Sequence, residues 1–296
     1  MNKREIQAVV CDLDGTLLTS KKKILNETRN ALIELQERGI KLILASSRTL
    51  FMLEEIIDSL QMRQHNGYAV CQNGLVTVDL SNAEIQEFSG ISDSQALEIF
   101  DYFKRYRHLG VFESEKGFQI HIPIKLRWAM PIYYYIIAKK KYSDMRNITF
   151  TLFGDFRFSP DQKIEIIHKR DELTFPVSKA GYIRLTKGMD KMVNQLNENF
   201  CELDIIRISR AWADIMPKGI NKAHGINSLS NKLGFGFENM IVFGDAENDI
   251  EMIKSARLGI AMGNAMQKVK QNADDITLSN NENGIAHALK KYGLIE

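Results

Sequence analysis

Short, wholly apolar runs alternate with longer amphipathic stretches over residues 1–80. The apolar runs predict strands that are buried on both faces of a sheet, and the stretches between them predict helices. Elements that alternate in this way favour a parallel sheet with right-handed crossovers. The predicted strands are Ala8 to Cys11, Lys41 to Ala45 and Tyr68 to Cys71, and the predicted helices are residues 26–38, with Asn26 as the N-cap, and about 49–60.

The same alternation returns near the end of the chain, after a middle part that lacks it. In residues 81–212, helix-like stretches (92–106 and 190–200) mix with short strand-like ones (118–122 and 163–167), which is typical of an α+β insertion. We therefore predict one α/β core domain formed by residues 1–80 and 213–296, with residues 81–212 as an inserted domain. The later predicted strands are Met240 to Phe243, Leu258 to Ala261 and one near Ile276, and the later predicted helices are 222–233, 248–255, 265–272 and 284–291.

Composition places the chain among ordinary globular proteins. Hydrophobic residues make up 44% of its 296 residues and charged residues 26%, which excludes a disordered chain, a collagen and a small disulfide scaffold. Lysine and arginine number 39 against 37 aspartates and glutamates, a net charge of +2. We expect no nucleic-acid partner, because such a partner favours a strongly basic chain. An anionic small molecule at a local site is allowed.

The cysteines and the apolar runs indicate a cytoplasmic protein. Cys11, Cys71 and Cys201 are odd in number and far apart, so neither a disulfide framework nor a zinc site is expected, and a reducing cytosol is the natural compartment. The first residues contain no long apolar segment of the kind found in signal peptides. The longest apolar run, Trp128 to Ala138, is interrupted by Pro131 and is too short to span a bilayer. No membrane partner is expected.

Two acidic loops follow predicted buried strands. Asp12 and Asp14 lie in the sequence DLDGT directly after the first strand, and Asp245 and Asp249 lie in GDAEND after a later one. Sites in open α/β sheets gather at the carboxyl ends of strands, and clustered carboxylates need a cation or a proton to relieve their repulsion. Oxygen ligands suit Mg²⁺. The alternative is a pair of solvated turns, but two such loops after apolar strands favour a site.

Two further features carry candidate anion-binding groups. Ser46, Ser47 and Arg48 end the second predicted strand and enter a helix, where a hydroxyl and backbone N–H groups can cradle an anion. The alternative is an ordinary serine N-cap. Lys222 opens a later helix, and a lone lysine is most often a solvated surface group. Neither feature indicates a site by itself.

Together the four segments resemble the motifs of the haloacid dehalogenase-like (HAD) phosphohydrolases, and within them the Cof-type phosphatases with a large type IIB cap. DLDGT is similar to the first motif, Ser46 and Lys222 stand where the second and third motifs have Ser/Thr and lysine, and GDAENDIEM is similar to the fourth. The resemblance implies a Rossmann-like parallel-sheet core with an inserted cap. Further Cof-like signatures are Asn73-Gly74, Ala261 to Ala265 and Asn283-Gly284.

The resemblance implies a covalent mechanism. Asp12 is expected to be the nucleophile that forms an aspartyl-phosphate. Asp14 is expected to protonate the leaving alcohol and then to activate water. Mg²⁺ is expected to be held by Asp12, the backbone carbonyl of Asp14 and Asp245, with Asp249 acting directly or through water. The metal would offset the repulsion between Asp12 and the phosphate dianion.

Phosphate binding falls to the second and third motifs. The resemblance implies that Ser46 and Lys222 bind phosphoryl oxygens as charge spreads over them in the transition state, with Ser47, Arg48 and Asn248 as further binding residues. The Cof pattern at the second motif is usually Thr-Gly-Arg. Here Ser46 keeps the hydroxyl, while Ser47 adds a Cβ where the family often has glycine.

The inserted cap is expected to close over the site and to choose the substrate. Its residues His121, Lys125 and Arg127 are candidate substrate contacts. The stretch Lys125 to Lys141 is both aromatic and basic, as in some single-strand nucleic-acid sites and interfacial helices, but we interpret it as an amphipathic cap element with a solvated basic end.

The function implied is a Mg²⁺-dependent phosphatase of small phosphorylated metabolites. Sugar phosphates, nucleotides such as FMN and pyridoxal phosphate are all candidate substrates. One alternative is a phosphomutase or phosphotransferase, in which another hydroxyl takes the place of water. Another is a binding or regulatory module without turnover, because a fold does not prove activity. The oligomeric state stays open.

Overall fold

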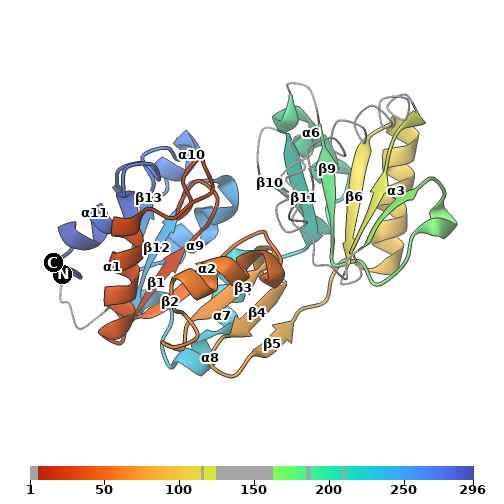
Figure 1. Ribbon diagram of the computed structural model, residues 1–296. Coiled ribbons are helices and arrows are strands. Elements are labelled where there is room, and N and C mark those ends of the chain that lie inside the picture. Colours follow the sequence, from red (N-terminus) through yellow and green to blue (C-terminus); the bar gives the residue numbers. More distant parts are fainter. Residues whose placement is uncertain (1–5, 115–116, 125–162, 185–187, 209–210) are drawn as a thin grey trace, which may run out of the picture. The chain divides into compact units, whose positions relative to one another are not determined.

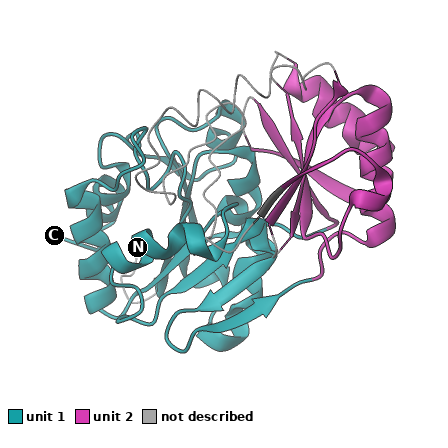
Figure 2. Ribbon diagram, turned by 45° about the vertical axis from the view of Figure 1, so that its right-hand side comes forward, with its two compact units in different colours: residues 1–88, 219–296 teal, residues 89–218 magenta. Residues whose placement is uncertain are grey.

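The computed structural model describes residues 6–114, 117–124, 163–184, 188–208 and 211–296. The chain divides into two compact units, one formed by Met1–Phe88 with Gly219–Glu296 and the other by Ser89–Lys218 (Figure 2). Both boundaries fall later in the chain than the predicted 80/81 and 212/213.

Backbone pairing explains why the predicted boundaries come too early. Strand β5 (Glu84–Glu87) lies beyond residue 80 but pairs with β4 (Val76–Asp79) in the sheet of the first unit. Strand β11 (Trp212–Pro217) lies almost wholly within the predicted core segment 213–296. It nevertheless pairs with β9 (Lys179–Ile183) and β10 (Leu203–Arg207) in the second unit. The predicted boundaries lie where the alternation of apolar strands and helices stops and returns, and the hydrogen-bonded ladders end several residues later.

The described part of the first unit contains an eight-stranded sheet with the order β14-β13-β12-β1-β2-β3-β4-β5 (Figure 1). The strands from β14 to β3 are parallel, as predicted, and β4 and β5 extend the sheet as antiparallel strands. The parallel strands other than β14 are short, mostly apolar runs because they are covered on both faces. Their bounds are β1 Ala8–Cys11, β2 Lys41–Ala45, β3 Tyr68–Cys71, β12 Met240–Gly244, β13 Leu258–Ala261 and β14 Asp275–Ile276.

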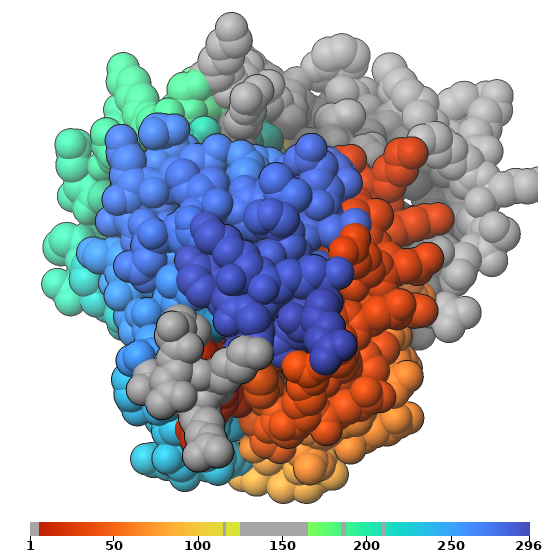
Figure 3. Space-filling model, turned by 90° about the vertical axis from the view of Figure 1, so that its left-hand side faces the viewer, coloured from red at the N-terminus to blue at the C-terminus, as the bar shows by residue number. Residues whose placement is uncertain are grey.

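The sheet extends to both sides of β1, and this places helices on both of its faces. The strands that follow β1 lie on one side of it and the strands of the C-terminal segment lie on the other, so right-handed crossovers put their helices on opposite faces. Helix α1 packs beside α11 (Figure 3), and α7 packs beside α9. The bounds are α1 Asn26–Glu37, α2 Glu54–Ser59, α7 Lys222–Ser228, α8 Ser230–Leu233, α9 Ile250–Ser255, α10 Gln267–Lys270 and α11 Gly284–Lys291.

Several predicted helices begin or end elsewhere in the structure. Asn26 is the first helical residue and Leu25 is the N-cap, so the predicted cap is wrong by one position. The helix predicted over 49–60 begins as a 3₁₀ turn, Leu50–Leu53. The one predicted over 222–233 is divided at Leu229, where the Ser228 hydroxyl donates to the carbonyl of Gly225.

The second unit contains a six-stranded sheet with the order β10-β11-β9-β6-β7-β8 over its described residues. Helices α3 (Asp93–Tyr106) and α6 (Met189–Asn199) cover one face through a buried cluster that includes Phe100, Phe103 and Tyr182. The remaining strands are β6 Leu109–Ser114, β7 Gly117–His121 and β8 Lys163–Ile167. The stretch 125–141, which we interpreted as an amphipathic cap element, lies outside the described residues.

Among the residues that the structure describes, no helix combines the length and the apolar character needed to cross a membrane.

Candidate active site

The two acidic loops meet because their strands are neighbours. Asp12 follows β1 and Asp245 follows β12, and these strands pair in parallel register. The backbone N–H of Asp12 continues the ladder by donating to the carbonyl of Phe243 at 3.1 Å. Both loops therefore emerge at the carboxyl edge of the sheet, beside β1, where the strand order reverses. That edge is where open α/β sheets place their sites.

Three carboxylates converge at this edge. Asp12, Asp245 and Asp249 each offer an oxygen, and the three oxygens lie within 4.8 Å of one another. Burial and the charge of Asp249 raise the pKa of Asp12, and burial together with the charges of Asp12 and Asp249 raises the pKa of Asp245. A hard divalent cation would relieve this repulsion, and carboxylate oxygens are its preferred ligands.

Lys222 lies between two of these carboxylates. It is the first residue of α7 and is 1% exposed, with its Nζ 2.6 Å from Asp12 Oδ1 and 2.7 Å from Asp249 Oδ1. Burial alone would lower its pKa, but the charges and hydrogen bonds of the two carboxylates outweigh burial and raise it. Lys222 is therefore a fixed ammonium ion inside the cluster. The solvated surface lysine that its type alone suggests is excluded.

Asp249 also shapes the loop around it. Its Oδ2 accepts the backbone N–H groups of Asp245 at 2.9 Å and Ala246 at 3.0 Å, and its side chain is fully buried. These bonds turn residues 247–249 into a 3₁₀ segment before α9 begins at Ile250, so the helix predicted from residue 248 starts two residues late. Asp249 thereby connects the Lys222 ammonium to the loop that carries Asp245.

Gly15 allows Asp245 to approach the first motif. Its φ is +91°, a conformation that favours glycine, and a Cβ at this position would overlap the carboxylate of Asp245. Thr16 Oγ1 then donates to Asp245 Oδ1 at 3.0 Å. The glycine of DLDGT is thus required both by the turn and by the neighbouring carboxylate.

The Gly15→Ala substitution is expected to displace Asp245 and to weaken divalent-metal binding by tenfold or more, on the order of the loss seen when a ligand's supporting contact is removed. Gly39→Ala is the matched control, because Gly39 has a similar φ of +85° but open space around the added Cβ. Both variants carry the cost of a left-handed alanine, about 1 kcal/mol. Isothermal titration with Mg²⁺ compares them, and equal metal affinity would contradict the role given to Gly15.

Asp14 is held by two cations. Arg48 binds it in bidentate fashion, with Nε 2.7 Å from Oδ2 and Nη2 2.6 Å from Oδ1, and Lys22 Nζ lies 2.5 Å from Oδ1. Burial would raise the pKa of Asp14, but the hydrogen bonds and charges of Arg48 and Lys22 outweigh it and lower this pKa to about 2. The sequence predicted Arg48 as a phosphate-binding residue. The structure places its guanidinium on Asp14.

Sequence reasoning missed Lys22. It lies in a run of three lysines, Lys21 to Lys23, and in no motif. A run of lysines normally indicates a solvated surface, so no signal in the sequence distinguishes Lys22 from its neighbours.

The other predicted phosphate-binding residues lie at the ends of β2 and β12. Ser46 is buried, and its Oγ accepts the backbone N–H of Arg48 at 3.2 Å. The φ of Ser47 is not positive, so a serine fits this backbone where the family often has glycine. Asn248 donates from Nδ2 to Asn73 Oδ1 at 3.1 Å, while its own buried Oδ1 has no hydrogen-bond partner among the described residues.

Of the three candidate contacts in the inserted domain, only His121 is described. It is 3% exposed, and its ring packs edge-on against Phe100 in the second unit, with centroids 5.1 Å apart. This places it in the core beside α3. Lys125 and Arg127 lie outside the described residues.

Cys11, one position before Asp12, is fully buried in the core of the first unit, and burial together with the nearby Asp12 charge raises the pKa of its thiol. A thiol in that environment is not a nucleophile.

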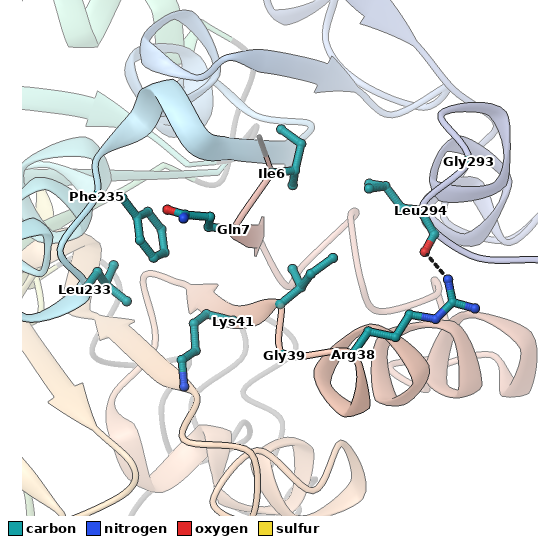
Figure 4. Close-up of a pocket in the computed structure, with 10 residues that line it drawn as sticks. Ile6, Gln7, Arg38, Gly39, Lys41, Leu233, Phe235, Gly293 and Leu294 are labelled. Carbon is teal, nitrogen blue, oxygen red and sulfur yellow. Dashed lines mark hydrogen bonds between the residues drawn. The ribbon is translucent and has the colours of Figure 1, made fainter. Parts of the chain in front are cut away.

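A cavity of about 460 Å³ lies at the opposite edge of the sheet (Figure 4). Its walls come from the segments that enter β1, β2 and β12 and from the end of the chain, including Gln7, Lys41 and Phe235. Arg38 closes one side by donating to the carbonyl of Leu294 at 2.8 Å. The described residues that line the cavity include no carboxylate, so they offer none of the charged ligands that a divalent cation prefers. The cavity is separate from the acidic cluster.

Comparisons with known proteins agree with this arrangement. A family model of the haloacid dehalogenase-like hydrolases matches residues 9–289. The 5-amino-6-(5-phospho-D-ribitylamino)uracil phosphatase of Bacillus subtilis is 29% identical over 298 residues, which cover 98% of this chain and 97% of the relative. A stress response protein of the same organism is 27% identical over 295 residues, with 97% and 93% covered.

Solved structures show the same fold. A HAD subclass IIB sugar phosphatase superposes with a TM-score of 0.76 at 23% identity, covering 98% of this chain and all of the other. A haloacid dehalogenase-like hydrolase from Bacteroides thetaiotaomicron gives a TM-score of 0.72 at 24% identity, with 97% and 99% covered.

Proposed function

This chain belongs to the haloacid dehalogenase-like hydrolase family and is a phosphatase, and from that premise we propose that it hydrolyses small phosphorylated metabolites with Mg²⁺ and an aspartyl-phosphate intermediate on Asp12. One observation carries the proposal: the Lys222 ammonium lies between Asp12 and Asp249, beside Asp245, at the carboxyl edge of the sheet. Such a cluster of charges at the carboxyl edge of a parallel sheet is suited to a phosphate and a cation.

The donor set fits a magnesium ion. Asp12, Asp245 and Asp249 provide oxygen ligands only, and burial together with the charges of neighbouring aspartates raises the pKa values of Asp12 and Asp245, a repulsion that a cation would relieve. We propose that Asp12 and Asp245 hold the ion, with the backbone carbonyl of Asp14, and that Asp249 contributes directly or through water. When bound, the ion supplies charge neutralisation for the phosphoryl group.

The residues of the chain divide the remaining chemistry. A carboxylate oxygen of Asp12 attacks phosphorus, and the bond from phosphorus to the alcohol oxygen breaks. Lys222 and Ser46 stabilise the charge on the phosphoryl oxygens. Asp14 gives its proton to the leaving alcohol and later takes one from the water that opens the aspartyl-phosphate. The ion pairs with Arg48 and Lys22 keep Asp14 anionic when no phosphate is bound. The negative charge of a bound phosphate raises the pKa of Asp14, so Asp14 takes up from solvent, on substrate binding, the proton that it then gives to the alcohol.

The proposed substrates are phosphate monoesters of polyhydroxylated small molecules. The Bacillus relative acts on a phosphorylated ribityl compound by its name, and a structural neighbour is a sugar phosphatase. The test is phosphate release by the purified protein from sugar phosphates, ribityl phosphates, FMN and pyridoxal phosphate, with Mg²⁺ and with EDTA. We expect metal-dependent release from at least one ester. Transfer of the phosphoryl group to an added alcohol without net phosphate release would instead identify a phosphotransferase.

A further inference from the structure

Lys22 contacts the reaction centre from outside every motif. Its Nζ lies 2.5 Å from Asp14 Oδ1, the same oxygen that accepts Arg48 Nη2 at 2.6 Å. Arg48 Nε binds the other oxygen at 2.7 Å. The Asp14 side chain is still 35% exposed, so a substrate can approach it, but the rotation of its carboxylate is restricted by three charge-assisted hydrogen bonds.

The backbone around Lys22 is arranged to return this side chain to Asp14. The N–H of Lys22 donates to the carbonyl of Thr19 at 2.9 Å, and both the N–H and the hydroxyl of Thr19 donate to the carbonyl of Lys23 at 2.9 Å. The turn holds Lys22 at a φ of +58°, in the left-handed region that residues other than glycine seldom occupy. Such conformations persist where surrounding contacts impose them, and they cluster at functional sites.

A second segment of the first unit fixes this turn from outside. Asn280, which is buried, donates from Nδ2 to the carbonyl of Leu18 at 2.8 Å, and Asn281 Oδ1 accepts the N–H of Ser20 at 3.0 Å. Leu18 in turn forms a bridge with Asp14. The turn that carries Lys22 is therefore fixed by its own hydrogen bonds and by a segment near the end of the chain.

We propose that Lys22 is a positioning residue, which together with Arg48 holds the Asp14 carboxylate where it meets the oxygen of the leaving alcohol. The inference rests on the proposed function, since it takes Asp14 as the acid and base. A misplacement of about 1 Å in a reacting group costs about 10²-fold in rate. Because Arg48 keeps two of the three hydrogen bonds, removal of Lys22 is expected to cost less, about tenfold.

The test compares two leaving groups in the Lys22→Met variant. An alkyl phosphate releases a poor leaving group that needs the proton of Asp14, whereas p-nitrophenyl phosphate releases a stable phenolate that does not. The ratio kcat/KM covers the steps up to departure of the leaving group, so it excludes the later attack of water. We expect kcat/KM to fall about tenfold for the alkyl phosphate and to stay within about twofold for p-nitrophenyl phosphate.

Neighbouring lysines provide matched controls. Lys21→Met and Lys23→Met remove the same charge from the same turn and should leave both substrates within about twofold of wild type. Lysine and methionine are both unbranched, so the left-handed φ strains them equally, and Lys22→Arg should restore most of the alkyl-phosphate activity.

Three results would overturn the inference. No loss in Lys22→Met would show that Lys22 is dispensable. An equal loss on both substrates, or a loss that Lys21→Met shares, would assign Lys22 to substrate binding or to stability. If the wild-type protein releases phosphate from neither ester, the proposed function fails first, and the inference fails with it.

Discussion

The Asp12→Asn variant is expected to lose on the order of 10⁴-fold or more in kcat on every phosphate ester, because removal of a covalent nucleophile eliminates the reaction path itself. Asparagine has the shape of aspartate, and its amide oxygen can still accept the hydrogen bond from Lys222 Nζ, now 2.6 Å from Asp12 Oδ1. The fold should therefore survive. Steady-state phosphate release measures the loss, and circular dichroism verifies the fold.

Asp79→Asn is the matched control. Asp79 is also a buried aspartate of the first unit, but its carboxylate accepts hydrogen bonds from Ser81 in β4's turn, away from the acidic cluster. Its kcat should stay within about twofold of wild type. Acid quenching during turnover of a ³²P-labelled ester should trap label on the wild-type protein and none on Asp12→Asn. Label on the variant, or undiminished release, would show that another group is the nucleophile.

The parallel core could be predicted because its central strands are apolar runs followed by polar loops. β1 and β12 are buried along their whole length, and a continuous apolar run has this meaning in a parallel sheet. Because sites lie at the carboxyl ends of strands, the sequence also predicts that Asp12 and Asp245 lie at the same edge of the sheet. The family resemblance identified Lys222, which its residue type alone would have assigned to the surface.

The remaining features depend on contacts that the sequence does not encode locally. The pairing of β5 with β4 depends on a hairpin whose second strand, Glu84–Glu87, is polar and exposed, so no hydrophobic period indicates it. The division of the helix at Leu229 depends on a hydroxyl-to-carbonyl bond. The turn that carries Lys22 to Asp14 is held in part by Asn280 and Asn281, more than two hundred residues later.

The Lys222→Met variant is expected to destabilise the metal-free protein by about 3–5 kcal/mol, the cost of leaving a buried ion pair without one partner. Asp12 and Asp249 each lose a hydrogen bond from Nζ, and three converging carboxylates remain without a cation. The kcat should also fall about 10²–10³-fold, because a charge directed at the phosphoryl oxygens is removed. Chemical denaturation in EDTA measures the first effect, and phosphate release with Mg²⁺ measures the second.

Lys179→Met is the control for the loss of a buried lysine that lies outside the proposed metal site. Lys179 is buried in the second unit, with Nζ 2.9 Å from Asp214 Oδ2 and 3.5 Å from Glu113 Oε2, so its removal should destabilise the protein to a similar extent. Mg²⁺ bound only by the folded state stabilises wild type and both variants, because all three keep the carboxylates of the cluster. The gain in stability should be larger in Lys222→Met, whose carboxylates lack the neighbouring ammonium, than in Lys179→Met, whose gain should equal that of wild type. No gain in Lys222→Met would contradict a metal site at Asp12, and the same gain in both variants would show that Lys222 is not coupled to it.

The unfolding free energy of Lys222→Met in EDTA should depend on pH through the same carboxylates. The pKa values of Asp12 and Asp245 are already raised, chiefly by burial, and Lys222 opposes that rise, so its loss raises them further. A carboxyl group whose pKa is higher in the folded than in the unfolded state binds protons on folding. The stability gained from this proton binding is fully present below the ordinary carboxyl pKa of about 4. It is lost as the pH rises through the raised pKa of the folded state. The difference in unfolding free energy between wild type and variant should therefore shrink as the pH falls from about 8 to about 5, and a constant difference would show that the carboxylates are not the cause.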